Sequence, residues 1–237
     1  ATTEIYTLSY TTLFRSVDLW LGGRETTVDV FLPPPGTAAS ARDAVILAHG
    51  FTRNRATLTG HAERLAREGI AVVVPDLPFL LHSGDNAAAL RDLVAMLLAG
   101  KFMPPASRVV LVGFSAGGLA ALLAADAPGV VGYVALDPFD RPSGIGLAAA
   151  KKLQLPAYIL RGPASACNAY SIAEPWGAAL PKLVTDRVVE HATHCDFESP
   201  TDWLCRAACG GTDDARRKAI GDALVNAVRA LLASRPS

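Results

Sequence analysis

Residues 108–117 read Arg-Val-Val-Leu-Val-Gly-Phe-Ser-Ala-Gly, and this stretch decides the fold that the sequence predicts. The apolar run at 109–112 indicates a buried strand, and residues 118–126 favour a helix. Between them, Gly113-Phe114-Ser115-Ala116-Gly117 has the G-x-S-x-G pattern of a sharp strand-to-helix turn that exposes a serine. Glycine at both ends lets the strand and the helix approach closely. We therefore interpret Ser115 as a candidate nucleophile rather than as part of an ordinary glycine turn.

Strands and helices alternate along the chain after the break at residues 33–36. Continuous apolar strands separated by helices indicate a mostly parallel sheet that is covered on both faces. We expect about eight strands, antiparallel at the N-terminal edge, in one α/β-hydrolase domain spanning residues 1–237. The predicted strands are 5–10, 14–21, 25–32, 44–48, 70–74, 109–112, 130–136, 156–160 and 183–190. The predicted helices are 55–68, 86–99, 118–126 and 213–232.

Composition excludes several classes of protein. Lys and Arg together number 22, as do Asp and Glu, so no net basic charge attracts nucleic acid. No apolar run reaches the roughly 18–20 residues that a membrane span needs. The sequence starts Ala-Thr-Thr without methionine, from which we expect that a leader or tag has been removed or left out.

The cysteines Cys167, Cys195, Cys205 and Cys209 lie in the last third of the chain and form no C-x-x-C pair. This spacing argues against a zinc ribbon or a thioredoxin-type site. They are either buried free thiols of a cytosolic protein or two disulfides formed in an oxidising compartment. We favour disulfides, and therefore a secreted or periplasmic protein. Cys205 and Cys209 fall on one turn of a helix, so we expect each to pair with one of the other two.

The carboxyl ends of the parallel strands are where this kind of sheet gathers its chemistry. Serine, aspartate and histidine appear at three separate strand ends, in the chain order that G-x-S-x-G hydrolases use. The strand ends read, in order, His-Gly-Phe at 49–51, Pro-Asp at 75–76, serine at 115, Asp-Pro-Phe-Asp at 137–140, Arg-Gly at 161–162 and His-Ala-Thr-His at 191–194.

A serine needs a base, because its own pKa lies far above neutral. Of the five histidines, we favour His194, which lies in the loop beyond the last strand, over His191 at the strand end. His49 falls in a tight turn and is interpreted as structural. His61 lies in the middle of a helix and is expected to be solvated. His82 could line a cleft but has the wrong position for a base.

The acid is expected one strand earlier than in many proteins of this kind. The loop after Arg161-Gly162 contains no carboxylate until Glu174. We therefore favour Asp137 as the acid, since Pro138 stiffens the turn and holds Asp137 near the strand end. Asp140 is the second candidate. Either aspartate could instead be a turn or helix-capping residue.

An oxyanion hole requires two amide donors. We expect the amides of Ala116 and Phe51 to supply them, with Gly50 letting the backbone turn inward. The Phe51 ring would flank the cleft, or else pack in the core. Trp176 and Trp203 could line an apolar pocket, although tryptophan is often buried. Our candidate substrate contacts are Phe51 and Trp176.

These motifs together resemble the chlorophyllase group of α/β-hydrolases. Related groups are the platelet-activating-factor acetylhydrolases and the bacterial cutinase-like polyester hydrolases. The resemblance covers about residues 40–205 and rests on segments 49–51, 113–117, 136–140 and 194–197. It implies a triad of Ser115, Asp137 and His194 and hydrolysis of an ester. The chain has alanine, not arginine, after the serine, and a cysteine-rich end, so the resemblance implies no particular ester.

The sequence thus predicts a serine carboxylic-ester hydrolase that works through an acyl-enzyme. We expect a monomer that acts on a small-molecule or polymeric ester, with no metal or organic cofactor. A polyester or lipid hydrolase with the same machinery is the alternative. A non-catalytic binding protein on the same fold is the alternative from a different class.

Overall fold

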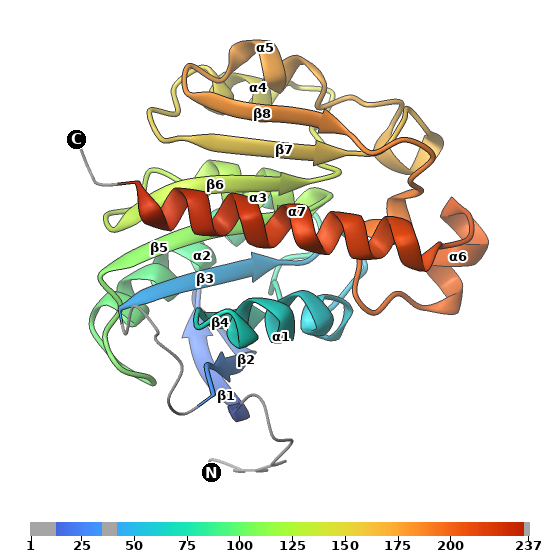
Figure 1. Cartoon of the computed structure of the whole chain (residues 1–237). Helices are drawn as coiled ribbons and strands as arrows, with labels where there is room; N and C mark the ends of the chain where they lie inside the picture. The colour runs from blue at the N-terminus through green and yellow to red at the C-terminus, as the bar shows by residue number, and fades with distance from the viewer. Residues whose placement is uncertain (1–12, 35–41, 235–237) are drawn as a thin grey trace.

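The structure is a computed structural model that describes residues 13–34 and 42–234. Eight strands of this part of the chain form one sheet, in the order β1-β2-β4-β3-β5-β6-β7-β8 (Figure 1). The strands are β1 (Leu13–Leu21), β2 (Arg24–Leu32), β3 (Asp43–Ala48), β4 (Ala71–Pro75), β5 (Arg108–Phe114), β6 (Val130–Leu136), β7 (Ala157–Arg161) and β8 (Leu183–Val188). The strand predicted at 5–10 lies outside the described residues.

Strand direction follows the prediction from the sequence. β1 pairs antiparallel with β2, and β2 pairs antiparallel with β4. All the other pairings, from β4 through β3, β5, β6 and β7 to β8, are parallel. Every residue of β3 is buried, as expected for a parallel strand with helices on both faces.

Helices cover both faces of the sheet. The helix α7 runs across the face seen in Figure 1 beside α1, while α2 and α3 lie behind the sheet. Apolar side chains of the sheet pack against each helix layer, so the core has two parts, one on each face. The helices are α1 (Thr59–Arg67), α2 (Ser83–Leu98), α3 (Ala116–Ala124), α4 (Ile145–Ala150), α5 (Pro175–Ala179), α6 (Trp203–Cys209) and α7 (Asp214–Ala233). Short 3-10 turns are η1 (Arg55–Leu58), η2 (Ala166–Asn168) and η3 (His194–Phe197).

The strand order reverses at β3, which lies between β4 and β5. The chain leaves β3 through α1 to reach β4 on one side, then returns through α2 to β5 on the other side. Open α/β sheets bind ligands at such a switch point, outside the carboxyl ends of the strands. Here those ends are Ala48 and Phe114, and Ala48 is paired with Gly113 in the sheet register.

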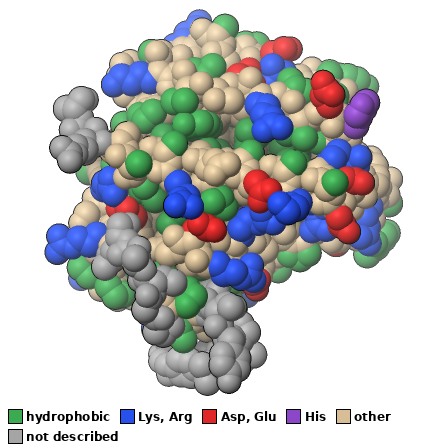
Figure 2. Space-filling view, viewed as in Figure 1, with side chains coloured by type: hydrophobic (Ala, Val, Ile, Leu, Met, Phe, Trp, Pro, Cys, Tyr) green, Lys and Arg blue, Asp and Glu red, His purple; other side chains and the backbone are tan. Residues whose placement is uncertain are grey.

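The face covered by α1 and α7 is a mixed, charged surface. Figure 2 shows Lys and Arg side chains interspersed with Asp and Glu across it, with apolar side chains between them. Some of these charges pair between the two helices, such as Arg64 with Asp222. Of the helices in the described ranges, none has the length and apolar character needed to span a membrane.

Several helices differ from the prediction. The expected helix at 55–68 is divided into η1, which Asn54 caps by accepting a hydrogen bond from the Ala56 amide, and α1. Helix α2 begins at Ser83, ahead of the predicted residue 86. The short helices α4, α5 and α6 were not predicted. Each has seven residues or fewer, too few to show a helical periodicity of apolar residues.

Two glycines allow β3, β5 and α3 to meet at the switch point. A Cβ built on Gly117 would lie 2.3 Å from the carbonyl oxygens of both Ala48 and His49. A Cβ on Gly113 would lie 2.2 Å from the carbonyl oxygen of Gly117. Only a residue without a side chain fits at either position, since the neighbouring atoms are backbone and cannot turn away.

We predict that Gly117→Ala lowers the free energy of unfolding by at least about 3 kcal/mol, because the new methyl group forces α3 away from β3. The matched control is Gly84→Ala in the first turn of α2, where a Cβ meets nothing within 4 Å. That change should stabilise the protein by up to about 1 kcal/mol. Urea unfolding followed by circular dichroism measures both. Equal stability of the two variants would contradict the packing argument.

Candidate active site

Ser115 occupies a strained turn between β5 and α3. Its backbone has φ 53° and ψ −122°, a conformation that residues other than glycine rarely adopt. Neighbouring backbone maintains it: the Ser115 amide donates to Leu136 at 3.0 Å, and the Ser115 carbonyl accepts from Phe139 at 3.1 Å. The turn at Ser115 is therefore hydrogen-bonded to the end of β6, next to the candidate acid Asp137.

His194 and Asp137, which lie 57 residues apart, meet in a buried hydrogen bond. The Nδ1 atom of His194 lies 2.5 Å from Oδ2 of Asp137, and both side chains are at least nine-tenths buried. An aspartate at Nδ1 selects the tautomer whose Nε2 atom carries the lone pair. Nε2 is then the ring nitrogen available to take a proton from a hydroxyl.

Asp137 is held by neighbours that orient its carboxylate. Its Oδ1 atom accepts hydrogen bonds from the Gly162 amide at 2.9 Å and from Nδ2 of Asn168 at 3.2 Å. Asn168 in η2 is a site residue that the sequence analysis did not find. No motif marks it, because its contact with Asp137 depends on how the loop after β7 folds back.

The segment around His194 has its own set of contacts. The His194 ring packs on Phe114, the residue before the candidate nucleophile, with ring centroids 4.6 Å apart. Two residues later, the buried Asp196 carboxylate accepts from the Thr193 amide at 2.8 Å and from Nε of Arg216 at 2.8 Å. A Thr-x-x-Asp spacing resembles a capping box and is the signal by which Asp196 could have been found.

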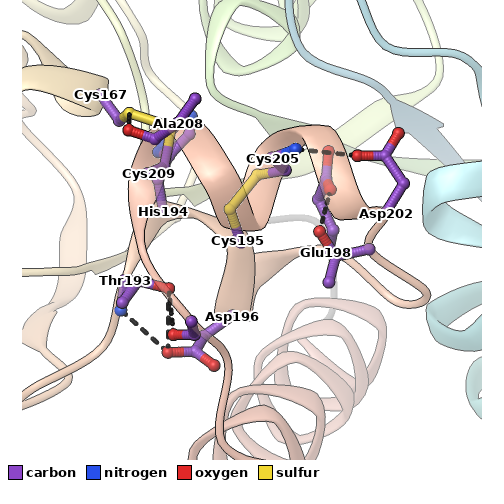
Figure 3. The surroundings of a disulfide bond; sticks show 12 residues. Cys167, Thr193, His194, Cys195, Asp196, Glu198, Asp202, Cys205, Ala208 and Cys209 are labelled. Atoms are coloured by element: carbon purple, nitrogen blue, oxygen red, sulfur yellow. Dashed lines mark hydrogen bonds between the residues drawn. A yellow bond between two sulfur atoms is a disulfide. The ribbon is translucent and has the colours of Figure 1, made fainter.

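Two disulfides attach α6 to the loops of the site (Figure 3). Cys195, next to His194, is bonded to Cys205, and Cys167 in η2 is bonded to Cys209. The predicted pairing of Cys205 and Cys209 with the other two cysteines is confirmed. The loops that carry the candidate base His194 and Asn168 are therefore both linked covalently to one short helix.

A cleft of about 590 Å³ opens beside Ser115. Ser115, Ala116, Phe51 and His194 all line it. Ala116 is the first residue of α3, so its amide has no acceptor within the helix and points to where an anion can bind. Phe51 follows Gly50, whose built Cβ would lie 3.1 Å from the Ser115 Cβ. The turn at residues 50–51 thus packs directly against the candidate nucleophile.

Other expected site residues lie elsewhere. Trp176 is fully buried and lines no part of the cleft, so the prediction that it contacts substrate is wrong. Its Nε1 donates to Asp140 at 2.9 Å, and Asp140 also accepts from the amides of Gly146 and Leu147 in the first turn of α4. Asp140 is thus a helix-capping residue, the alternative that the sequence left open. Trp203 is largely exposed outside the cleft.

Two of the remaining histidines are buried, and the other two, His82 and His191, do not line the cleft. His49 is buried, with Nδ1 hydrogen-bonded to the Gly50 carbonyl and Nε2 accepting from the Leu77 amide, both at 2.8 Å. Burial lowers the pKa of the His49 imidazole, although the bond with Gly50 acts in the other direction. His191 is exposed. His61, expected to be solvated, is buried in α1 with Nε2 3.0 Å from the Phe197 carbonyl, because α1 packs against η3.

Among the residues that the structure describes, one group of side chains is spaced closely enough to hold a metal ion, and it consists of cysteines. The sulfur atoms of Cys195, Cys205 and Cys209 lie within 4.8 Å of one another. All three are in disulfides, and a metal binds the thiolate rather than the disulfide.

A mostly parallel eight-stranded sheet with a strained serine turn at its switch point defines the α/β-hydrolase class. Residues 45–170, more than half of the chain, match the alpha/beta hydrolase family. The chain belongs to this family. No curated protein matches the sequence well enough to be considered a relative.

Solved structures share the fold at low sequence identity. A dienelactone hydrolase from Anabaena variabilis has a TM-score of 0.73 and 17% identity, covering 93% of this chain and 98% of its own. A lidless α/β serine hydrolase from Xanthomonas campestris has a TM-score of 0.69 and 19% identity, and the match covers 94% of this chain and 97% of that protein. Est1E from Butyrivibrio proteoclasticus has a TM-score of 0.70 and 14% identity, and the match covers 92% of this chain and 99% of that protein.

We predict that His61 makes stability depend on pH. Burial, opposed by the hydrogen bond to Phe197, lowers the pKa of His61 from 6.5 to about 4. The unfolded chain therefore binds a proton more readily, so stability falls by about 3 kcal/mol as the pH drops from about 6.5 to about 4. His61→Gln, which keeps a donor for Phe197, should lack this part of the loss. Urea unfolding of both proteins at several pH values measures it, and parallel curves would contradict the assignment.

Proposed function

We propose that this protein is a serine carboxylic-ester hydrolase. The observation that carries the proposal is the buried bond between His194 and Asp137, since His194 lines the same cleft as the strained Ser115. Three residues from three strand ends converge on one edge of the sheet, where an acid, a base and a nucleophile can act in sequence.

In the proposed reaction, Ser115 Oγ attacks the ester carbonyl while His194 Nε2 takes its proton. Asp137 keeps the imidazole in the required tautomer and stabilises the imidazolium that forms. The protonated His194 then donates to the alcohol oxygen, which leaves. Water, activated by the same imidazole, hydrolyses the acyl-enzyme and restores the serine.

The negative charge on the tetrahedral intermediate requires donors that are already in position. The amides of Ala116 and Phe51 are the proposed pair, one at the N-terminus of α3 and one in the turn after β3. Donors on rigid backbone do not have to reorganise during the reaction, which is why such amides are effective. The packing of Gly50 against Ser115 supports this role for Phe51.

We predict that Ser115→Ala lowers kcat/KM for p-nitrophenyl butyrate by at least about a thousand-fold, since the nucleophile is lost. A fluorophosphonate probe should label the wild type but not this variant. Ser143→Ala, at an exposed serine outside the cleft, is the control and should keep both properties. A wild type that neither hydrolyses esters nor reacts with the probe would favour the non-catalytic binding protein.

A specific observation also favours the alternative of a polyester or lipid hydrolase. Large apolar side chains surround the mouth of the cleft although about half or more of each is exposed: Phe51 (48%), Leu80 (64%), Leu81 (56%) and Leu204 (51%). Apolar area in water is unfavourable until something covers it. A long acyl chain or a polymer surface would cover this rim.

We predict that the double variant Leu80→Ser/Leu81→Ser lowers kcat/KM for p-nitrophenyl decanoate by about ten-fold, because the apolar contact of two leucines is lost. The acetate ester, too short to reach the rim, should change by less than about two-fold. Val184→Ser, at an exposed position on β8 away from the cleft, should affect neither. Equal losses for both esters would show that the rim does not contact the acyl chain.

A further inference from the structure

An arginine–glutamate pair lies in the wall of the cleft and takes no part in the proposed chemistry. Nε of Arg53 donates to Oε1 of Glu198 at 2.5 Å, and Nη2 donates to Oε2 at 3.0 Å. The Glu198 side chain is fully buried and that of Arg53 is one-tenth exposed. A two-point bond between planar groups fixes both orientation and distance, which a single contact does not.

Arg53 ends the turn that holds the proposed oxyanion donor. The Arg53 amide donates to the Gly50 carbonyl at 3.2 Å and closes a turn around Phe51. The backbone that carries the Arg53 side chain therefore belongs to the same turn as the Phe51 amide, which is the proposed oxyanion donor.

Glu198 ends the short helix that holds the proposed base. The Glu198 amide donates to the Cys195 carbonyl at 3.2 Å, which closes η3 directly after His194. Thr201 Oγ1 donates to Glu198 at 2.7 Å, so the carboxylate has a further partner on its own side. The two side chains thus join the end of the oxyanion turn to the end of the base turn, across 145 residues of sequence.

Two carboxylates lie against the Arg53 guanidinium. Asp202, which caps α6 by accepting from the Cys205 amide (Figure 3), also lies 3.0 Å from Nη2 of Arg53. Burial disfavours the guanidinium charge, but the bonds and charges of Glu198 and Asp202 outweigh it and raise the pKa of Arg53. Because both carboxylates already occupy this arginine, a negatively charged substrate would have to compete with them for it.

The two loops also meet through contacts that do not involve the pair. The Ser199 amide donates to Thr57 at 2.8 Å, and the Gly60 amide donates to Ser199 at 2.6 Å. His61 contacts the Phe197 carbonyl as described above. These bonds attach residues 197–199 to η1 and α1. A change in the pair therefore leaves the loop attached and alters the orientation of the two turns.

We propose that Arg53 and Glu198 are positioning residues that set the distance between the oxyanion donor of Phe51 and the base His194. The inference rests on the function proposed above. The pair affects the transition state rather than substrate binding. The donor and the base must both be correctly placed around Ser115 at the moment when charge develops on the substrate and the proton is transferred. Loss of the pair should therefore lower kcat and leave KM nearly unchanged.

The test uses Arg53→Lys, which keeps a charge but loses the fork, and Glu198→Gln, which keeps the shape and leaves Arg53 paired with Asp202. Each should lower kcat for p-nitrophenyl butyrate about ten- to a hundred-fold, with KM within about three-fold. The double variant should be little worse than either single variant, because both break one bridge. The rate of labelling by the fluorophosphonate probe should fall in parallel.

The matched control is Arg108→Lys, at a bidentate pair with Asp43 at the opposite end of the sheet. It should lower thermal stability as the test variants do, but keep kcat within about two-fold. Test variants that retain the kcat of the control, or whose losses multiply in the double variant, would overturn the inference. A wild type without hydrolysis or labelling would instead overturn the proposed function. In that case the downfield proton NMR signal of the His194–Asp137 bond still tests whether Arg53 and Glu198 position His194. That signal should shift in Glu198→Gln and stay in place in Arg108→Lys; an unmoved signal in Glu198→Gln would also overturn the inference.

Discussion

The close approach of α3 to the end of β3 is the constraint on which the rest of the site depends. Gly117 brings the helix against the carbonyl oxygens of Ala48 and His49, and this contact forces the chain into the strained conformation at Ser115. The same contact places the turn after β3 beside the serine. The proposed nucleophile and the proposed oxyanion donor thus depend on one backbone packing arrangement, built where the strand order reverses.

The proposed base is supported differently. His194 lies in a short 3-10 turn that regular hydrogen bonding could not hold by itself. Its position comes from the carboxylate of Asp137, the ring of Phe114, the disulfide of the adjacent Cys195 and the ion pairs of Asp196 and Glu198. A base on an irregular segment needs many attachments, because each one removes only part of the conformational freedom. The wall of the cleft is therefore held in large part by contacts between side chains that lie far apart in the sequence.

The residues proposed for catalysis could be selected from the sequence, and the contacts that support them could not. G-x-S-x-G between a strand and a helix is a local pattern, and so are an aspartate and a histidine after apolar strands. Asn168, Arg53 and Glu198 have no such pattern, since each acts across a gap between loops that only folding closes. Trp176 shows the opposite case. Its place after a strand suggested a pocket, but an aspartate in the core accepts its indole hydrogen bond and holds it inside.

The sequence by itself determined the direction of the strands, the serine turn, the edge of the sheet at which polar residues gather, and the partners expected for Cys205 and Cys209. These follow from periodicity, glycine stereochemistry and chain connectivity, which are properties of short segments. Only the tertiary structure showed that His194 bonds to Asp137 while Asp140 caps α4, buried His61 in the core, and brought Arg53 to Glu198. Those outcomes depend on how loops of different strands pack, and the energy of such contacts is set by atoms that no single segment contains.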